Sequence, residues 1–564
     1  MGLSVIGSGV IILVIMIFVM YTIPGIIDSF NSLGDVSSEA SNLENSILQT
    51  DISIDTLSAT SGESWVTFNL NNDGSEKLWN FDEFEVFITY DADIGGTKTV
   101  VTEQFTYLPL SSDFKIQRGE LIMLSTETSS TITEGVDFDD CTGDCFVKLV
   151  NSRLTGTGRT TVGANINQDA YTTYISDDSG LTTPGGDVTF TRHVTDGINN
   201  RLQWEIWEYV GNSGESNEIV VLDTGVCTFA AAGLTCDGAG PGPATDDADV
   251  VVFVTGVGSP NGGRNENAAM LVTSDWIQVL GVDVPRFTRE STGGSPAVDV
   301  SYAIVEFTGS NWGVERVERP GSATTTTTTL LTTDVGDISR SFFHAQQSNV
   351  DNVGTDGLCE AKEKIELTAT DTLTFTHSQC TGGWDADMNE VIWVIRNSQT
   401  APGFKILVQH IDPPNRVSAD IRESDWTDSE EDDWGIGITT LTYDLDESAI
   451  TGLTGQSAGT GTAYPRGSIS VILKNSTAAY FYHSDHTNTQ DYAFQVTELP
   501  RHIGVTNWSI RNILNDFTDP GLINTDETAQ ITALLTYPIF SGGNVAVVVS
   551  TDKGVTSSNA IIVT

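Results

Sequence analysis

One segment of the sequence has the spacing of a catalytic serine, Gly455-Gln456-Ser457-Ala458-Gly459, which matches the pattern G-x-S-x-G. In hydrolases with this pattern a strand precedes the serine and a helix follows it, so that the hydroxyl is exposed above the helix N-terminus. The next residues here include Gly461 and Pro465 and cannot begin a helix. We therefore predict a flexible loop at this position, and we expect neither a catalytic residue nor enzymatic activity.

The six cysteines fall into three local pairs, and their spacing favours disulfides. None of the pairs has the C-x-x-C spacing of a zinc site, and suitable histidine partners are missing. Disulfides persist in oxidising compartments, so this interpretation places the protein outside the cytoplasm. Two N-x-S/T sequons, at Asn475 and Asn507, are the predicted glycosylation sites and agree with that location. The expected disulfides are Cys141–Cys145, Cys227–Cys236 and Cys359–Cys380.

Aspartates around the first cysteine pair form the strongest candidate for an ion site. Calcium prefers such oxygen ligands, and the disulfide would hold the loop in place. The spacing does not match an EF-hand loop, and in a chain with 76 acidic residues such clusters also arise as solvated loops. Both interpretations stay open, and calcium is the one cofactor that the sequence suggests. The four candidate ligands are Asp137, Asp139, Asp140 and Asp144.

The first fifty residues predict one long helix with two different halves. No charged residue occurs from Val5 to Ile27, which is enough apolar chain to span a bilayer. After Asp28 the apolar residues recur three or four positions apart, as on one face of a helix. A signal peptide would have a basic start and a small-residue cleavage site, so we expect a retained anchor. Residues expected to contact the membrane or neighbouring copies are Ile11, Val14, Phe18, Phe30, Leu33, Val36, Leu43 and Ile47.

Beyond residue 50 the pattern is that of β-strands. Val66, Phe68 and Leu70 alternate with polar residues, and Asn71-Asn72-Asp73-Gly74 predicts a hairpin turn after them. The 564 residues are too many for one core, so several domains are expected. The net charge of −50 repels nucleic acid, which excludes a nucleic-acid partner.

A short motif recurs through the middle of the chain. Phe-Thr-Arg begins at Phe190 and Phe287, and related but more divergent segments begin at Phe375 and Phe481. Each precedes a strand-like run rich in aromatic or β-branched residues. The interval is about 100 residues, the size of a β-sandwich module. The Thr-rich segment 324–329 between two of these units predicts an edge strand.

Two terminal segments resemble a known family. The start Met1-Gly2-Leu3-Ser4-Val5-Ile6-Gly7-Ser8-Gly9, the single long helix and the segment Phe68-Asn69-Leu70-Asn71-Asn72-Asp73-Gly74-Ser75 are similar to the archaeal flagellar accessory protein F. The closing segment, from Trp508 through Thr551-Asp552-Lys553-Gly554-Val555, resembles the end of archaellin-like sandwiches. The resemblance covers residues 1–110 and 500–564 and extends more distantly to archaeal pilins. It implies a membrane helix and an outer β-sandwich that contacts the surface layer.

These patterns predict a mainly β protein, with an N-terminal long hydrophobic helix followed by tandem immunoglobulin-like β-sandwich domains. The expected domains are the helix at 1–50, a discontinuous sandwich from 51–110 with 500–564, one module each at 111–215 and 216–320, and one or more modules at 321–499. We expect a membrane-anchored structural protein of the cell surface that contacts the surface-layer protein or other cell-surface partners. Alternatives are a filament subunit that forms a homopolymer through its helix, and a carbohydrate-binding or carbohydrate-active protein whose tryptophans stack on sugars.

Overall fold

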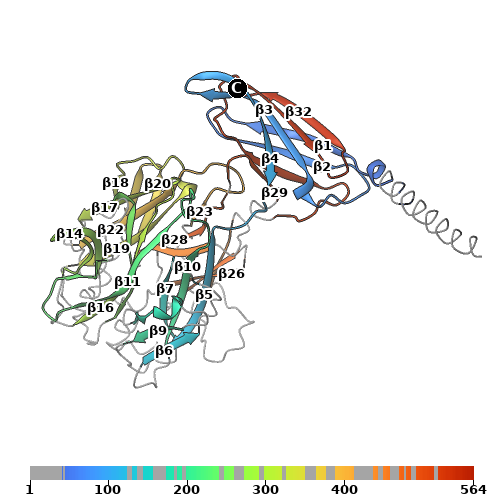
Figure 1. Ribbon diagram of the computed structural model, residues 1–564. Coiled ribbons are helices and arrows are strands. Elements are labelled where there is room, and N and C mark those ends of the chain that lie inside the picture. Colours follow the sequence, from blue (N-terminus) through green and yellow to red (C-terminus); the bar gives the residue numbers. More distant parts are fainter. Residues whose placement is uncertain are drawn as a thin grey trace, which may run out of the picture. The chain divides into compact units, whose positions relative to one another are not determined.

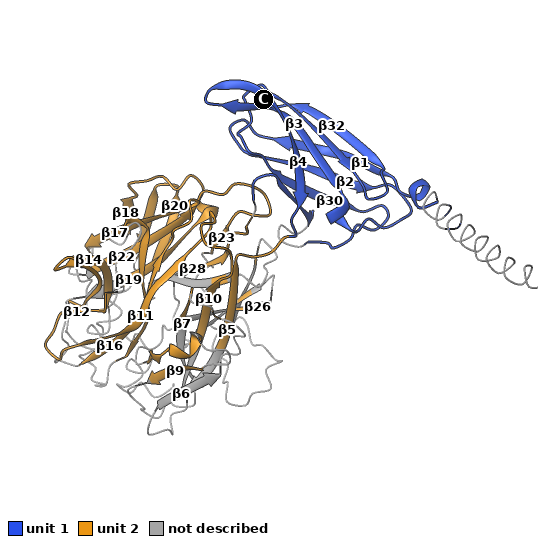
Figure 2. Cartoon of the chain, in the orientation of Figure 1, with its two compact units in different colours: residues 1–109, 503–514, 519–564 blue, residues 110–502, 515–518 orange. Residues whose placement is uncertain are grey.

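The computed structural model describes residues 38, 41 and 45–564, except for the segments 124–129, 136–140, 142–143, 156–172, 183–186, 193–198, 241–246, 259–271, 291–296, 321–325, 350–363, 377–387, 412–435, 442–448, 458–468, 476–477, 484–490, 503 and 514–518. The chain divides into two compact units, coloured separately in Figure 2. Unit 1 comprises residues 1–109, 503–514 and 519–564, and unit 2 comprises residues 110–502 and 515–518.

Unit 1 contains eight strands joined in one sheet, in the order β1-β2-β30-β29-β4-β3-β31-β32 (Figure 1). Neighbouring strands are antiparallel except β29 and β4, which are parallel. Because Asn559 on the last strand donates to the carbonyl of Ile54 on the first, the two edges of the sheet lie side by side. The elements are β1 (Ile52–Ala59), β2 (Trp65–Asn72), η1 (Phe81–Glu83), β3 (Glu85–Ile94), β4 (Thr97–Tyr107), β29 (Asn507–Asn512), β30 (Thr528–Leu534), β31 (Asn544–Ser550) and β32 (Thr556–Ile562).

The alternation predicted for β2 is confirmed, because Val66, Phe68 and Leu70 are all fully buried in the core of unit 1. The predicted hairpin after β2 is wrong. Strand β2 pairs with β1 and β30, and β3 pairs with β4 and β31. The reason lies in Asn72, whose buried side chain donates to the carbonyls of Glu76 and Ile523 and holds the chain in the core. The asparagine therefore ends β2 without reversing it.

Unit 2 repeats one six-stranded arrangement four times. In each module the first, sixth and third strands form one three-stranded sheet in that order, and the second, fifth and fourth strands form another. The first module contains β5 (Phe114–Met123), β6 (Ser130–Gly135), β7 (Cys145–Thr155), β8 (Thr173–Asp177), η3 (Ser179–Thr182), β9 (Asp187–Arg192) and β10 (Asn199–Tyr209). The second contains β11 (Val220–Phe229), β12 (Thr235–Asp237), η4 (Asp247–Asp249), β13 (Val250–Gly258), β14 (Thr273–Val279), β15 (Val282–Thr288) and β16 (Val298–Glu306).

The third and fourth modules follow the same plan. The third contains β17 (Trp312–Pro320), β18 (Thr326–Leu330), η6 (Ile338–Arg340), β19 (Ser341–Asn349), β20 (Lys364–Ala369), β21 (Thr372–Thr376) and β22 (Met388–Asn397). The fourth contains β23 (Leu407–Ile411), β24 (Ile436–Thr440), β25 (Ala449–Ser457), β26 (Ile469–Asn475), β27 (Ala478–His483) and β28 (Asp491–Glu498). Within the third module the Thr-rich strand β18 pairs only with β21 among the described strands, so the predicted edge strand is confirmed.

The recurring phenylalanines mark the same place in every module. Phe190, Phe287, Phe375 and Phe481 lie on the fifth strands β9, β15, β21 and β27. The first three are buried between the two sheets of their modules. The sheets that contain the sixth strands contribute side chains from all four modules to one shared hydrophobic core. The modules of unit 2 are therefore packed together through one half of each sandwich.

The predicted fold class is wrong in two respects. The described chain is nearly all β, and none of its helices is long and apolar enough to cross a membrane. Of the predicted helical contact residues only Ile47 is described, in a short helix over residues 45–49, where it is 39% exposed and no buried stripe forms. The others, Ile11, Val14, Phe18, Phe30, Leu33, Val36 and Leu43, lie outside the described residues. The described modules also have two three-stranded sheets, whereas immunoglobulin domains have at least seven strands.

Candidate functional site

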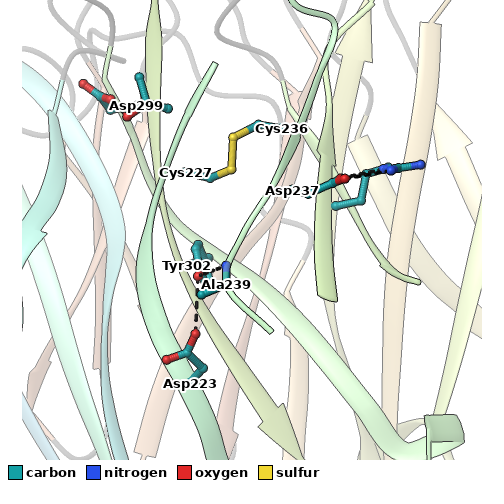
Figure 3. Close-up of a disulfide and its surroundings, with 9 residues drawn as sticks. Asp223, Cys227, Cys236, Asp237, Ala239, Asp299 and Tyr302 are labelled. Carbon is teal, nitrogen blue, oxygen red and sulfur yellow. Dashed lines mark hydrogen bonds and ion pairs between the residues drawn. A yellow bond between two sulfur atoms is a disulfide. The ribbon is translucent and has the colours of Figure 1, made fainter. Parts of the chain in front are cut away.

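The Cys227–Cys236 disulfide connects the two sheets of the second module (Figure 3). Cys227 lies on β11 and Cys236 on β12, which belong to different sheets. In the first module Cys141 and Cys145 also form a disulfide, at the start of β7. Cys359 and Cys380 lie outside the described residues. Cross-links of this kind favour an oxidising environment for unit 2.

Polar contacts surround the disulfide of the second module. The hydroxyl of Tyr302, on β16, accepts a hydrogen bond from the backbone N–H of Ala239 at 3.1 Å and donates to the Asp223 carboxylate at 3.4 Å (Figure 3). Burial raises the pKa of Tyr302 to about 12 and also raises the pKa of Asp223. On β12, Asp237 forms two short contacts with the guanidinium of Arg286, at 2.6 and 2.8 Å. These contacts fix both strands that carry the cysteines.

Arg289, the arginine of the second Phe-Thr-Arg motif, closes the turn between β11 and β12. Its guanidinium donates to the carbonyls of Gly233 at 2.8 Å and of Ala230 and Ala231 at 3.1 Å. It also lies 4.9 Å from the ring centroid of Phe229, a cation–π distance. The side chain is fully buried. The motif found in the sequence therefore has a structural role, in which one buried cation satisfies three carbonyls of a turn.

In unit 2 a group of four buried and one half-buried polar residues, here called the junction cluster, connects the segments between modules. It consists of Asp113, Asn217, Asn311, Asn397 and Arg501. The Asn217 amide donates to the Asp113 carboxylate at 3.2 Å and to the Arg501 carbonyl at 3.0 Å. Its oxygen accepts from the amides of Asn311 at 2.9 Å and Asn397 at 3.3 Å. One asparagine thereby contacts segments that flank all four modules.

Two glutamines make similar contacts between neighbouring modules. Gln346 of the third module accepts from the backbone N–H of Ser274 at 2.6 Å and donates to the carbonyl of Val252, both in the second. Gln495 of the fourth module accepts from the N–H of Phe343 in the third at 3.2 Å and donates to the carbonyl of the same residue. Breaking such a contact would leave buried backbone groups unsatisfied. The sequence analysis missed both residues. Gln495 is a polar residue in the apolar run Tyr492-Ala493-Phe494-Gln495-Val496, whereas Gln346 is followed by Gln347 and Ser348 and gives no such signal.

The centre of unit 2 contains a small cavity with room for about one water molecule, lined by residues of all four modules. The Lys148 ammonium lies 5.7 and 5.5 Å from the ring centroids of Trp207 and Phe253. Burial lowers the pKa of Lys148, and burial together with Lys148 holds the pKa of His344 well below its usual value. The Nε2 atom of His344 is buried and has no hydrogen-bond partner among the described residues. Protonation of this histidine therefore opposes folding.

Of the predicted calcium ligands, the structure describes only Asp144; Asp137, Asp139 and Asp140 lie outside the described residues. The Asp144 carboxylate accepts a hydrogen bond from the N–H of Val221 in the next module, at 3.4 Å. Burial raises the pKa of Asp144. This residue therefore contributes to module packing, and the calcium prediction is not tested.

Both sequon asparagines and the described part of the serine pattern lie on strands. Asn475 ends β26, and Asn507 begins β29, where its amide donates to the carbonyl of Thr106 at 3.4 Å. Ser457 is the last residue of β25, so the predicted flexible loop is wrong for Gly455 to Ser457, which pair with β28. These residues are in strand conformation because they continue the pairing of β25 with β28. The pairing persists although β25 contains Gly452 and Gly455.

Comparisons with known proteins identify no family. No protein-family model and no curated protein matches the chain. Among solved structures, a similarity is found to the crystal structure of Salmonella alpha-2-macroglobulin reacted with methylamine, with 8% sequence identity and a TM-score of 0.09. It covers 91% of this chain and 39% of that chain, so the sequence spans well under half of that structure. The resemblance to the archaeal flagellar accessory protein F stays a prediction.

Proposed function

We propose that this protein is an extracellular structural protein whose four-module unit 2 is a rigid, disulfide-bonded scaffold for contacts with other cell-surface components. The observation that carries the proposal is the fourfold repetition of one six-stranded module around a shared core. Modules that are held together by one shared core present a stable outer surface for such contacts. The disulfide between the two sheets of the second module supports an oxidising location.

The charge of the chain also supports this proposal. A net charge of −50 keeps a protein dispersed and repels anionic surfaces. Contacts with partners are then expected to form through neutral or basic surfaces on other proteins. A surface-layer protein or a protein of a neighbouring cell is the class of partner we propose.

The first test is surface labelling of intact producing cells with a membrane-impermeant biotin reagent that reacts with lysine. Lys98, whose side chain is 43% exposed, is a suitable target. We expect labelling of intact cells to equal labelling after lysis, with a cytoplasmic protein as the control that is labelled only after lysis. If this protein behaved like the control, the extracellular location would be wrong.

The second test addresses the contact with partners. The purified full-length chain is mixed with isolated cell envelopes and sedimented, in its oxidised form and as the Cys227→Ala/Cys236→Ala variant. We expect saturable binding of the oxidised protein and weaker binding of the variant, because a less rigid scaffold loses more conformational entropy on binding. Absence of saturable binding by the oxidised protein would contradict the structural proposal.

A further inference from the structure

Three potential metal ligands meet beside the junction cluster, although they are far apart in the sequence. Asp113 directly precedes β5, Glu215 lies between β10 and β11, and His502 follows β28. One carboxylate oxygen from each acid and one ring nitrogen of the histidine all lie within 4.8 Å of one another. Two atoms that bind one divalent cation at about 2.0–2.2 Å lie at most about 4.4 Å apart, so a small side-chain movement brings these three ligand atoms within binding distance of one cation.

Neighbouring groups hold the two carboxylates in place. The Asp113 carboxylate accepts from Asn217, which the rest of the junction cluster fixes from the other side. The Glu215 carboxylate accepts from the backbone N–H of Asn212 at 3.0 Å, from the amide of the same residue at 2.6 Å and from the Tyr209 hydroxyl at 3.4 Å. Hydrogen bonds of this kind orient the ligands of protein metal sites.

The electrostatics of this group also favour a cation. Asp113 is only 3% exposed, and one of its carboxylate oxygens lies within 4.8 Å of a Glu215 oxygen. The His502 Nδ1 lies 3.3 Å from a Glu215 oxygen, so the imidazole already points toward the carboxylates. Two carboxylates that approach each other in a buried place are costly, and a divalent cation between them offsets that cost.

We propose that Asp113, Glu215 and His502 bind one divalent cation of the zinc class beside the junction cluster. Two oxygens and one imidazole nitrogen are ligands that Zn²⁺ accepts, whereas Ca²⁺ and Mg²⁺ take oxygen ligands almost exclusively. The cation joins the first and last segments of unit 2 to the connection between its first two modules. It therefore stabilises the folded unit, since the unfolded chain has no such site.

The test uses the intact chain, stripped with EDTA and then titrated with ZnCl₂. Isothermal titration calorimetry and elemental analysis after desalting are expected to give one zinc per chain. Differential scanning calorimetry is expected to show a rise in the Tm of the unit 2 transition, which equal concentrations of Ca²⁺ or Mg²⁺ do not produce. Zinc binding without a change in Tm, or an equal response to Ca²⁺, would overturn the proposal.

Matched variants locate the site. Asp113→Asn, Glu215→Gln and His502→Gln are each expected to lose more than about 100-fold in zinc affinity, because removal of a supporting hydrogen bond alone typically costs 10–100-fold. Tyr209→Phe, which removes the hydroxyl that contacts Glu215 and the carbonyl of Asn212 but keeps all three ligands, is expected to fall in that lower range. Asp283→Asn, a carboxylate that accepts from Gln278 elsewhere in the second module, is the control and is expected to bind zinc normally.

The Asp113→Asn variant separates loss of metal from loss of fold. It removes a buried charge, so in EDTA its Tm is expected to equal or exceed that of the wild type. The same variant is expected to show no rise in Tm with zinc. If all three ligand variants kept a stoichiometry of one and the wild-type affinity, the bound zinc would belong to other residues and the assignment would be wrong.

Discussion

Unit 1 and unit 2 are both built from β-strands, but they bury different kinds of side chain. The core of unit 1 is mostly apolar and joins strands from near both ends of the sequence. Unit 2 buries charged and amide groups between its modules, among them Asn217, Gln346 and Gln495. All six cysteines and all seven histidines of the chain also lie within residues 110–502. Both units therefore have an apolar core, and unit 2 adds disulfides and buried hydrogen bonds between its modules.

This difference determines how the stability of each unit responds to pH and to redox state. Apolar packing is insensitive to mild changes in pH or redox state. A buried histidine, in contrast, responds to pH, and a disulfide responds to reductant. Unit 2 should therefore respond to acid and to reductant under conditions that leave unit 1 unchanged. The predictions below test this contrast, beginning with the largest expected effect.

The largest effect is expected in unit 1, at Trp508. Its fully buried ring lies 4.8 Å from that of Tyr107 and within 6.4 Å of those of Phe81 and Phe84, measured between centroids. Trp508→Ala should lower the free energy of unfolding of unit 1 by about 3–5 kcal/mol, because it leaves a large cavity. Scanning calorimetry should show that only the unit 1 transition moves. A similar shift of both transitions would mean that the two units unfold together.

The second effect concerns the disulfide of the second module. The Cys227→Ala/Cys236→Ala variant removes a cross-link between residues nine positions apart, which should lower the stability of unit 2 by about 2–3 kcal/mol. Denaturant titration under oxidising conditions measures the loss, and the unit 1 transition is the internal control. An unchanged midpoint for unit 2 would show that the Arg289 contacts hold the turn without the cross-link.

Parts of this contrast could be predicted from the sequence. The alternation at Val66 to Leu70 is visible because one face of a half-buried strand repeats every two residues. The recurrence of Phe190 and Phe287 is visible because both modules bury the same side chain on the fifth strand. Both patterns can be recognised from a few neighbouring residues, without knowing which distant residues they contact in the fold.

The contacts between modules could not be predicted. Asn217 donates a hydrogen bond to the carbonyl of Arg501, which is 284 positions away in the sequence. Gln495 accepts one from the N–H of Phe343, which is 152 positions away. A single polar residue in a loop or strand has no periodicity, and its partner is set by how the modules pack. The Asp113, Glu215 and His502 group was missed for the same reason, because its members come from three separate segments.

The third prediction concerns pH and His344. Above about pH 6.5 this residue is neutral in both the folded and unfolded states, and its full contribution to stability is present. Because burial and Lys148 lower its pKa in the folded state, stability falls by up to about 1.4 kcal/mol per pH unit below 6.5, where only the unfolded chain takes up the proton. His344→Gln should abolish this part of the loss.

The comparison must be made between the wild type and this variant at each pH. The carboxyls of Asp178 and Asp223 have raised pKa values and shift stability in the opposite direction, but they are present in both proteins. Urea titrations of unit 2 between pH 7 and 5 provide the measurement. Parallel curves for the two proteins would mean that His344 is protonated in the folded unit, contrary to its position beside Lys148.

The smallest effects are expected for ion pairs with at least one exposed member, in either unit. Arg286 and Asp237 of unit 2 are each 37% exposed, whereas in unit 1 Lys98 is 43% exposed and its partner Asp91, 2.9 Å away, is buried. Water and salt screen such pairs, so double-mutant cycles with Arg286→Met and Lys98→Met should give coupling energies below about 1 kcal/mol that decline further in 1 M NaCl. A coupling energy above about 2 kcal/mol in only one unit would mean that these ion pairs also contribute to the difference in stability between the units. Equal and small values would mean that the units differ in their interiors, where unit 2 adds buried polar contacts between modules to an apolar core.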